Sequence, residues 1–173
     1  MILRPRALAK GDLVAVAAPS GPFEPADEPM LQRGVATLEA MGFRVRVTPL
    51  VRSGRRWWSA AAPADQAAEL NGLLRDPEVR AVVAHTGGKS TMAYLDQIEL
   101  DAIRRDPKPI LGYSDISVLH LALHARTGLV GMHADIATHG FGGDWHTLVD
   151  EPRRRELIAL YTRVLTRREA PGT

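Results

Sequence analysis

The sequence of 173 residues contains no cysteine, and this absence excludes two kinds of site. Disulfide bridges cannot form, and metal centres with thiolate ligands are excluded as well. Long apolar runs are also missing, because no stretch approaches the roughly 20 residues of a membrane-spanning helix. The first residues, Met1 to Arg6, carry no apolar segment typical of a secretion signal. We therefore expect a cytoplasmic protein without a membrane partner.

Clusters of positive charge are scarce. The formal net charge is +2, and the arginines are scattered along the chain. The tightest group, Arg153-Arg154-Arg155, is followed directly by Glu156. Surfaces that bind nucleic acid need lysines and arginines gathered on one face. We therefore expect no nucleic-acid partner.

An apolar content of 45% is typical of a folded domain, and the length suits a single domain with a sizeable core. Five short apolar or β-branched runs predict strands at residues 13–18, 44–48, 79–84, 109–112 and 129–132. Helical patterns lie between them at residues 28–41, 64–74, 91–105 and 116–126. This alternation predicts an α/β fold, with a parallel, Rossmann/flavodoxin-like sheet of about five strands and helices on both faces.

The last part of the chain has a different pattern. Gly142-Gly143-Asp144 predicts a break in the regular structure. Residues 147–165 predict one helix with charged faces, and residues 169–173 have the composition of a linker. We find no internal repeat and no low-complexity tract.

A strand, a tight turn and a helix are compressed into the segment from Pro109 to Ser117. Ser114 stands in the turn at the carboxyl end of the strand, where open α/β sheets bind ligands. The start of the next helix offers free N–H groups and partial positive charge for a developing oxyanion, so Ser114 is a candidate nucleophile. Such a serine needs a base, and His85 or His133, each after a predicted strand, could approach it. The alternative is that Ser114 or Asp115 only caps the helix.

A second loop, Gly87-Gly88-Lys89-Ser90-Thr91, follows the predicted strand at residues 79–84. A phosphate-binding P-loop would need a glycine at position 83, but Val83 stands there inside the strand. This departure argues against a P-loop-like nucleotide binder. The glycine pair can still expose backbone N–H groups at the same sheet edge as Ser114, and the alternative is an ordinary turn.

His120 and His124 are four residues apart on a predicted helix, which is a spacing that two zinc ligands can use. No glutamate follows His120 to complete a metalloprotease pattern. Only His133 and His139 could join them in a site. We therefore favour ordinary packing for these histidines and expect no metal.

Several segments carry a common pattern, and the most specific is Asp106-Pro107-Lys108-Pro109 leading into Gly112-Tyr113-Ser114-Asp115. The others are residues 15–22, 76–83, 87–88, 95–96 and 127–130. In order and spacing, from about residue 3 to residue 140, they resemble the LD-carboxypeptidase family. These are serine peptidases that include muramoyltetrapeptide carboxypeptidase and the microcin-immunity peptidases.

The resemblance implies roles for individual residues. Ser114 corresponds to the nucleophile, and the backbone N–H groups of Asp115 and Gly88 correspond to the oxyanion hole. Candidates for the substrate pocket are Ser20, Gly87 and Lys89. No metal and no cofactor are implied. The family's Ser-Glu-His triad takes its glutamate and histidine from a C-terminal domain, and these two residues have no counterpart in this chain.

The resemblance also predicts how the chain is organised. Residues 1–140 correspond to a nucleophile-bearing α/β domain, and residues 141–173 to a helix and linker toward a C-terminal domain that is absent from this chain. The glycine loop is closer to the microcin-immunity subgroup, and Ala134-Asp135 replaces the usual Gly-Pro after the fifth strand.

We expect a serine carboxypeptidase-type hydrolase, inactive as this incomplete half and homodimeric in its full-length form. Its substrate would be a small peptide or peptide conjugate, either a murein LD-peptide or a microcin-type peptide–nucleotide. The alternative is a catalytically degenerate α/β domain that binds a ligand or peptide.

Overall fold

A computed structural model describes residues 2–53 and 55–167 of the chain. Its centre is a parallel sheet of five strands in the order β2-β1-β3-β4-β5. The strands are β1 (Leu13–Ala17), β2 (Arg44–Val47), β3 (Val79–Ala84), β4 (Ile110–Gly112) and β5 (Met132–His133). This is the flavodoxin-like order, and the predicted α/β fold is confirmed.

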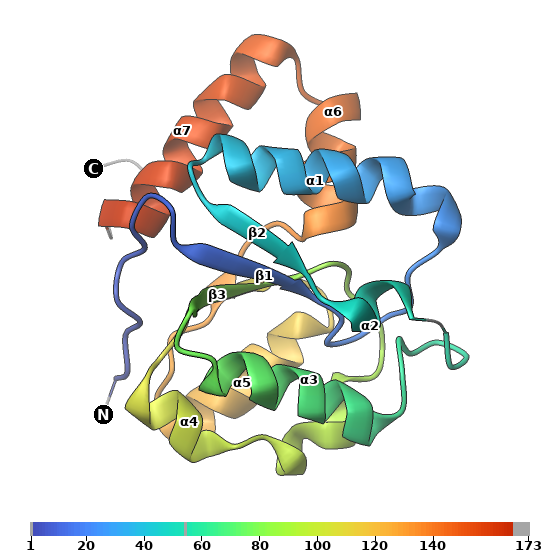
Figure 1. The fold of residues 1–173 in the computed structure, drawn as a ribbon, viewed down its shortest axis with the longest axis vertical. Coiled ribbons are helices and arrows are strands. Elements are labelled where there is room, and N and C mark those ends of the chain that lie inside the picture. The colour runs from blue at the N-terminus through green and yellow to red at the C-terminus, as the bar shows by residue number, and fades with distance from the viewer. Residues whose placement is uncertain (1, 54, 168–173) are drawn as a thin grey trace.

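Helices cover both faces of the sheet (Figure 1). One side carries α1 (Glu28–Ala40), α6 (Trp145–Thr147) and α7 (Glu151–Arg167), and the other carries α3 (Pro63–Arg75), α4 (Leu100–Arg105) and α5 (Ile116–Thr127). The shorter elements are α2 (Pro49–Arg52), the 3₁₀ helices η1 (Pro25–Asp27) and η2 (Thr91–Gln97), and the π-helix η3 (Ala137–Asp144).

The central strand β1 shows why the sequence has continuous apolar runs. Val14 and Val16 enter a core with Leu31 of α1, whereas Ala15 enters a second core with Leu70 of α3. Since alternate side chains of a strand point to opposite faces, a strand covered on both sides must be apolar at every position.

The fifth strand differs from the prediction, because it comprises Met132 and His133 and not residues 129–132. Gly128, in the left-handed conformation with φ +80°, ends α5. Leu129 then pairs with Leu3 near the N-terminus in an isolated bridge. The backbone therefore pairs with β4 only at Met132, the last residue of the predicted run, and at His133 after it.

The predicted break at Gly142-Gly143-Asp144 is wrong, because these residues lie inside η3. A Cβ atom on Gly142 would overlap the carbonyl oxygen of Met30 in α1, and one on Gly34 of α1 would overlap that of Ala137 in η3. These glycines therefore let two helical backbones touch.

The C-terminal helix begins at Glu151, later than predicted. Asp150 caps it by accepting a hydrogen bond of 2.9 Å from the N–H of Arg153, and Pro152 occupies its first turn, where proline is tolerated. Phe141 and Leu165 pack in the same core as α1. The division at residue 140 stays a prediction, and the predicted linker at residues 169–173 lies outside the described residues.

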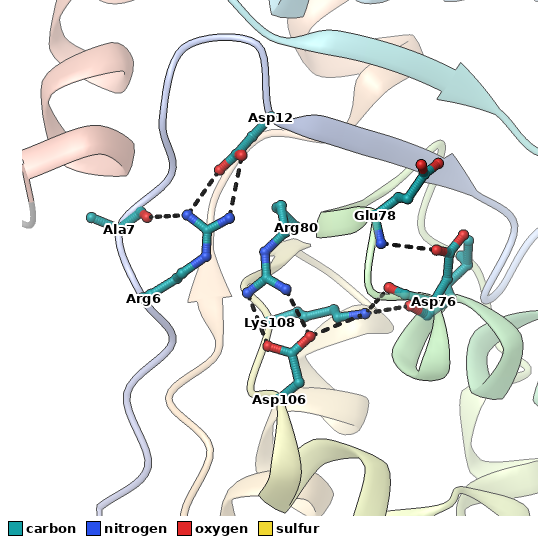
Figure 2. A network of polar contacts seen from close by, with 9 residues as sticks. Arg6, Ala7, Asp12, Asp76, Glu78, Arg80, Asp106 and Lys108 are labelled. Atoms are coloured by element: carbon teal, nitrogen blue, oxygen red, sulfur yellow. Dashed lines mark hydrogen bonds and ion pairs between the residues drawn. The ribbon is translucent and has the colours of Figure 1, made fainter.

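Charged side chains connect β3, the segment before β4 and the end of α3 near the amino ends of the strands (Figure 2). Arg80, in β3, donates two hydrogen bonds of 2.7 and 2.9 Å to Asp106. The ammonium group of Lys108 is fully buried and donates to the carbonyl oxygens of Leu73 and Asp76 at the end of α3, at 2.9 and 2.5 Å. The segment that enters β4 is thus fixed to α3, at the end of the sheet opposite the candidate site.

Candidate active site

The candidate site is formed by the loops that follow β1, β3 and β4. The strand order places β1 beside β3 and β3 beside β4, so the three loops meet at the carboxyl edge of the sheet. The switch in strand order between β1 and β3 lies here, where open α/β sheets bind ligands. A cavity of about 430 Å³ opens at this edge, and its lining includes Gly87, Gly88, Lys89 and Ser114.

Ser114 occupies a strained turn between β4 and α5. Its φ angle is +62°, in the left-handed region that residues with a side chain rarely adopt. Gly112, just before the turn, has φ +157°, and a Cβ atom there would lie 2.9 Å from the side chain of Ile116. A sharp strand-to-helix turn of this kind holds an exposed serine above a sheet edge.

The glycine pair lies beside this serine. A Cβ atom on Gly87 would come within 3.1 Å of the Ser114 Oγ, so the missing side chain leaves room around the hydroxyl. Gly88 has φ +155°, and a Cβ atom on it would overlap the hydroxyl of Ser20. Only glycine fits both positions without a shift of the neighbours.

Two backbone N–H groups remain available at this point. Neither the N–H of Gly88 nor that of Asp115 donates a hydrogen bond within residues 2–53 and 55–167. An unpaired N–H at a ligand-binding edge can stabilise a negative oxygen. The chemistry that this arrangement allows is acyl transfer to the serine.

The capping interpretation of Ser114 and Asp115 is wrong. No side chain at the start of α5 makes a capping hydrogen bond. The Ser114 hydroxyl has no hydrogen-bond partner in the described part of the chain, and the Asp115 carboxylate bonds to other loops. Both side chains are thus free of the role that most often explains such residues.

The Asp115 carboxylate connects all three loops. Its Oδ2 accepts hydrogen bonds from the Ser20 hydroxyl at 2.5 Å and from the N–H groups of Ser90 and Thr91 at 2.8 and 3.0 Å. Partial burial raises the pKa of this carboxyl, but the hydrogen bonds outweigh burial and lower its pKa overall. Ser20, predicted to line the pocket, is fully buried and binds Asp115 instead.

Several residues that support the loops were missed by the sequence analysis. Gln66 of α3, itself buried, donates to the carbonyl oxygens of Ala18 and Ser20 at 3.1 and 2.8 Å. Tyr94 donates to the carbonyl oxygen of Pro19 at 2.5 Å. The available signal was a polar residue, Gln66, on the apolar face of a predicted helix.

Neither candidate base hydrogen-bonds to Ser114. His85 is buried, and its Nε2 lies 3.0 Å from the carbonyl oxygen of Gly21. Burial lowers the pKa of His85 to about 4. His133 is exposed and packs near the ring of Tyr113, with ring centres 6.2 Å apart. Among the described residues, no histidine hydrogen-bonds to the Ser114 hydroxyl.

The histidines of α5 have packing roles. His120 Nε2 lies 2.9 Å from the carbonyl oxygen of Ile110, and His124 Nδ1 lies 3.1 Å from that of Leu129. Within the residues that the structure describes, no group of three or more potential ligands could hold a metal ion.

The sequence model of the LD-carboxypeptidase N-terminal domain matches residues 14–134, which include all three loops. This chain belongs to the LD-carboxypeptidase family. It is 36% identical, over 82% of its length, to a Bacillus subtilis protein named a probable murein peptide carboxypeptidase, and covers 43% of that protein. It is 28% identical, over 78% of its length, to the microcin C7 self-immunity protein MccF of Escherichia coli, and covers 39% of it.

Solved structures show the same relationship. MccF without ligand superimposes with a TM-score of 0.85 at 26% identity, over 97% of this chain and 48% of that one. Muramoyltetrapeptide carboxypeptidase from Oxalobacter formigenes gives a TM-score of 0.65 at 25% identity, over 80% of this chain and 44% of that one. The chain thus spans less than half the length of these relatives. None of its described helices is both long and apolar enough to cross a membrane.

Proposed function

We propose that this chain is the nucleophile-bearing part of a serine carboxypeptidase. The observation that carries the proposal is the strained turn at Ser114 beside the unpaired N–H groups of Gly88 and Asp115. In the reaction, the Ser114 Oγ attacks the carbonyl carbon of the scissile amide, and its proton passes to a base. The negative oxygen of the tetrahedral intermediate accepts hydrogen bonds from the two N–H groups. The C–N bond then breaks, the amine leaves with a proton, and water hydrolyses the acyl-enzyme.

The base and its orienting acid belong to a part of the protein that this chain does not contain. Family resemblance assigns them to a histidine and a glutamate of a C-terminal domain. Residues 1–140 then bear the nucleophile, and residues 141–173 lead toward that domain. Since nucleophile and base act as a unit, the isolated chain is nearly inert, with at most the roughly 10³–10⁴-fold acceleration over water that an oxyanion hole and binding give alone.

The substrate is a small peptide or a peptide conjugate, and the full-length protein acts in the cytoplasm as a homodimer. Structures of MccF hold aspartyl sulfamoyl adenosine and glutamyl sulfamoyl guanosine, and the Bacillus subtilis relative is named a probable murein peptide carboxypeptidase. The cavity beside Ser114 is lined by the cationic side chain of Lys89, the exposed ring of Trp58, and Arg55, whose guanidinium is paired with Glu24 in the same lining. Lys89 is therefore the cation that suits an anionic group of the substrate near the scissile bond.

A second candidate function is that of a catalytically degenerate domain that binds a ligand or peptide. It is favoured by one observation, namely that no described histidine hydrogen-bonds to the Ser114 hydroxyl. The two functions differ in whether Ser114 reacts once a base is supplied.

Labelling with a fluorophosphonate separates them. The Ser114 oxygen attacks phosphorus, fluoride leaves, and added imidazole takes the proton in place of the missing base. We expect labelling of the chain to be slow in buffer and to rise in proportion to the imidazole concentration, with the adduct located at Ser114 by peptide mass spectrometry. Ser114→Ala abolishes labelling, whereas Ser117→Ala, at the nearest other serine in the sequence, retains it.

Two results would contradict the proposal. If Ser114 stays unlabelled at every imidazole concentration, the degenerate binding domain is the better account. If labelling is fast without imidazole and is lost in His85→Ala or His133→Ala, the chain carries its own base and is not an incomplete enzyme.

A further inference from the structure

We propose that the side chain of Asp115 is a positioning group that holds the glycine loop against the Ser114 turn, and so fixes the spacing of the two N–H groups that bind the oxyanion. The inference rests on the proposed function for its catalytic meaning. It assigns to one residue two separate tasks, because the backbone N–H of Asp115 binds the substrate oxygen while its carboxylate orients the other donor.

The hydrogen bonds run from the turn to the loop that carries Gly88. Asp115 Oδ2 accepts from the N–H groups of Ser90 and Thr91, at 2.8 and 3.0 Å. The Thr91 hydroxyl donates in turn to the carbonyl oxygen of Asp115 at 3.1 Å. Ser90 and Thr91 follow Gly88 by two and three residues, so these bonds restrain the loop directly beside it.

The loop after β1 also hydrogen-bonds to Asp115 and to the glycine loop. The Ser20 hydroxyl donates to Asp115 Oδ2 at 2.5 Å, and the Ser90 hydroxyl donates to the Ser20 carbonyl oxygen at 3.1 Å. The N–H of Gly21 donates to the carbonyl oxygen of Gly87 at 2.8 Å. Ser20 is fully buried and Ser90 is buried, which shields these bonds from water.

The carboxylate is suited to this role by its charge. A single oxygen that accepts three hydrogen bonds is best supplied by an ionised carboxyl, which has no proton of its own to place. The hydrogen bonds lower the pKa of Asp115 below 3.8 despite its partial burial, so it stays charged at neutral pH. The charge of Asp115 also acts on the buried hydroxyl of Tyr94. Burial raises the pKa of Tyr94 most, and the negative charges of Asp115 and Glu69 raise it further.

Amide resonances of the isotope-labelled chain test the restraint without any catalysis. We expect the amide proton shifts of Ser90 and Thr91 to change together as the pH falls, with one apparent pKa below the 3.8 of a free aspartate. In Asp115→Asn this titration disappears, and at neutral pH the backbone order of Gly88 decreases. Asp135→Asn is the matched control, because that carboxylate lies after β5 and accepts from Trp145 and Tyr161 at 3.0 and 2.8 Å.

The functional readout is the imidazole-dependent labelling of Ser114. Asp115→Asn should slow it by roughly 10- to 100-fold, since displacement of a catalytic donor by about 1 Å has a cost of that size. Ser20→Ala, which removes one of the three donors and leaves the charge, should slow it less and raise the apparent pKa seen at Ser90 and Thr91.

The proposal is overturned if the Ser90 and Thr91 shifts titrate with an apparent pKa of 3.8 or above, or if Asp115→Asn leaves the Gly88 order and the labelling rate unchanged. If Ser114 is not labelled in the unaltered chain, the proposed function is contradicted but the restraint by Asp115 is not. The amide titration of Ser90 and Thr91 measures that restraint without any reaction at Ser114. If Asp115→Asn does not fold, the titration of the unaltered chain and Ser20→Ala still decide the question.

Discussion

At the scale of single residues, Gly88 carries the strictest requirement in the site. It combines φ +155° with a direct approach to the Ser20 hydroxyl and to the Gly21 nitrogen, which a Cβ atom would meet at 2.6 Å. We predict that Gly88→Ala lowers the free energy of unfolding by about 1–3 kcal/mol, the usual cost of such backbone strain. In Gly88→Ala the imidazole-dependent labelling of Ser114 should also be lost, because the strained loop no longer holds the Gly88 N–H in place.

Gly72 provides the matched control. It lies within α3, its φ is not strained, and a Cβ atom added to it would meet no neighbour within 4 Å. Gly72→Ala should therefore stabilise the protein by about 0.5–1 kcal/mol, since alanine is the better helix former. Urea unfolding followed by tryptophan fluorescence measures both variants, and equal effects of the two substitutions would contradict the account of Gly88.

His85 makes the stability of the fold depend on pH. Burial lowers its pKa from 6.5 to about 4, so between these values the unfolded chain binds a proton that the folded chain does not. Stability therefore falls as the pH falls, and His85 accounts for a loss of about 2–3 kcal/mol near pH 4.5 relative to neutral pH.

Replacement of His85 by glutamine tests this pH dependence, because the amide can still donate to the Gly21 carbonyl oxygen. In urea unfolding at several pH values, His85→Gln should lose stability less steeply in acid than the unaltered chain. His133→Gln, at an exposed position, should keep the original slope. The same slope in all three proteins would show that His85 is not the buried neutral group described here.

Which site residues could be predicted depends on the range of their contacts. Ser114 and the glycine pair could be predicted because each follows a strand within a few residues, and local pattern fixes such positions. The hydrogen bonds of Gln66 and Ser20 could not be predicted, because their partners lie 46 to 95 residues away in sequence; for Ser20 the family resemblance gave a place in the pocket but not its bond to Asp115. Their roles follow only from the order of the strands.

At the scale of elements, the sequence predicted the parts whose ends carry strong local signals. The strand from Val79 to Ala84 has the predicted bounds, and α5 ends before Gly128 as its left-handed cap requires. The bounds of the fifth strand and the presence of η3 could not be predicted. Their form depends on pairing of Leu129 with Leu3 and on close contact between α1 and the glycines of η3.

Lys108 links the segment that enters β4 to the end of α3, and its replacement should destabilise both. Its buried ammonium satisfies carbonyl oxygens at the end of α3, which would otherwise lie without a partner. We predict that Lys108→Met destabilises the protein by roughly 2–4 kcal/mol, since hydrogen bonds to charged groups are lost and the carbonyls stay buried. Lys10→Met, at an exposed position, should change the stability by less than about 0.5 kcal/mol.

Thermal and urea unfolding of both lysine variants measure this difference. Hydrogen exchange should locate the loss of protection at the last turn of α3. If Lys108→Met is as stable as the unaltered chain, the buried ammonium does not support α3 as the structure indicates.

At the scale of the whole molecule, the site exists because the strand order gathers three loops at one edge of the sheet. The loops after β1, β3 and β4 come from distant parts of the chain, and the Asp115 carboxylate joins them through side-chain and backbone hydrogen bonds. The chain spans less than half of its relatives, and the proposed function places the base in the remainder. The central claim is therefore that this half already holds the nucleophile and both oxyanion donors in working geometry.

A crystal structure of the chain with Ser114 phosphonylated, prepared with added imidazole, tests this claim most directly. The phosphonyl oxygen takes the place of the negative oxygen in the tetrahedral intermediate. We predict that it lies about 3 Å from the backbone nitrogens of both Gly88 and Asp115, with the loops unmoved. An adduct whose oxygen faces solvent, or contacts neither nitrogen, would contradict the account.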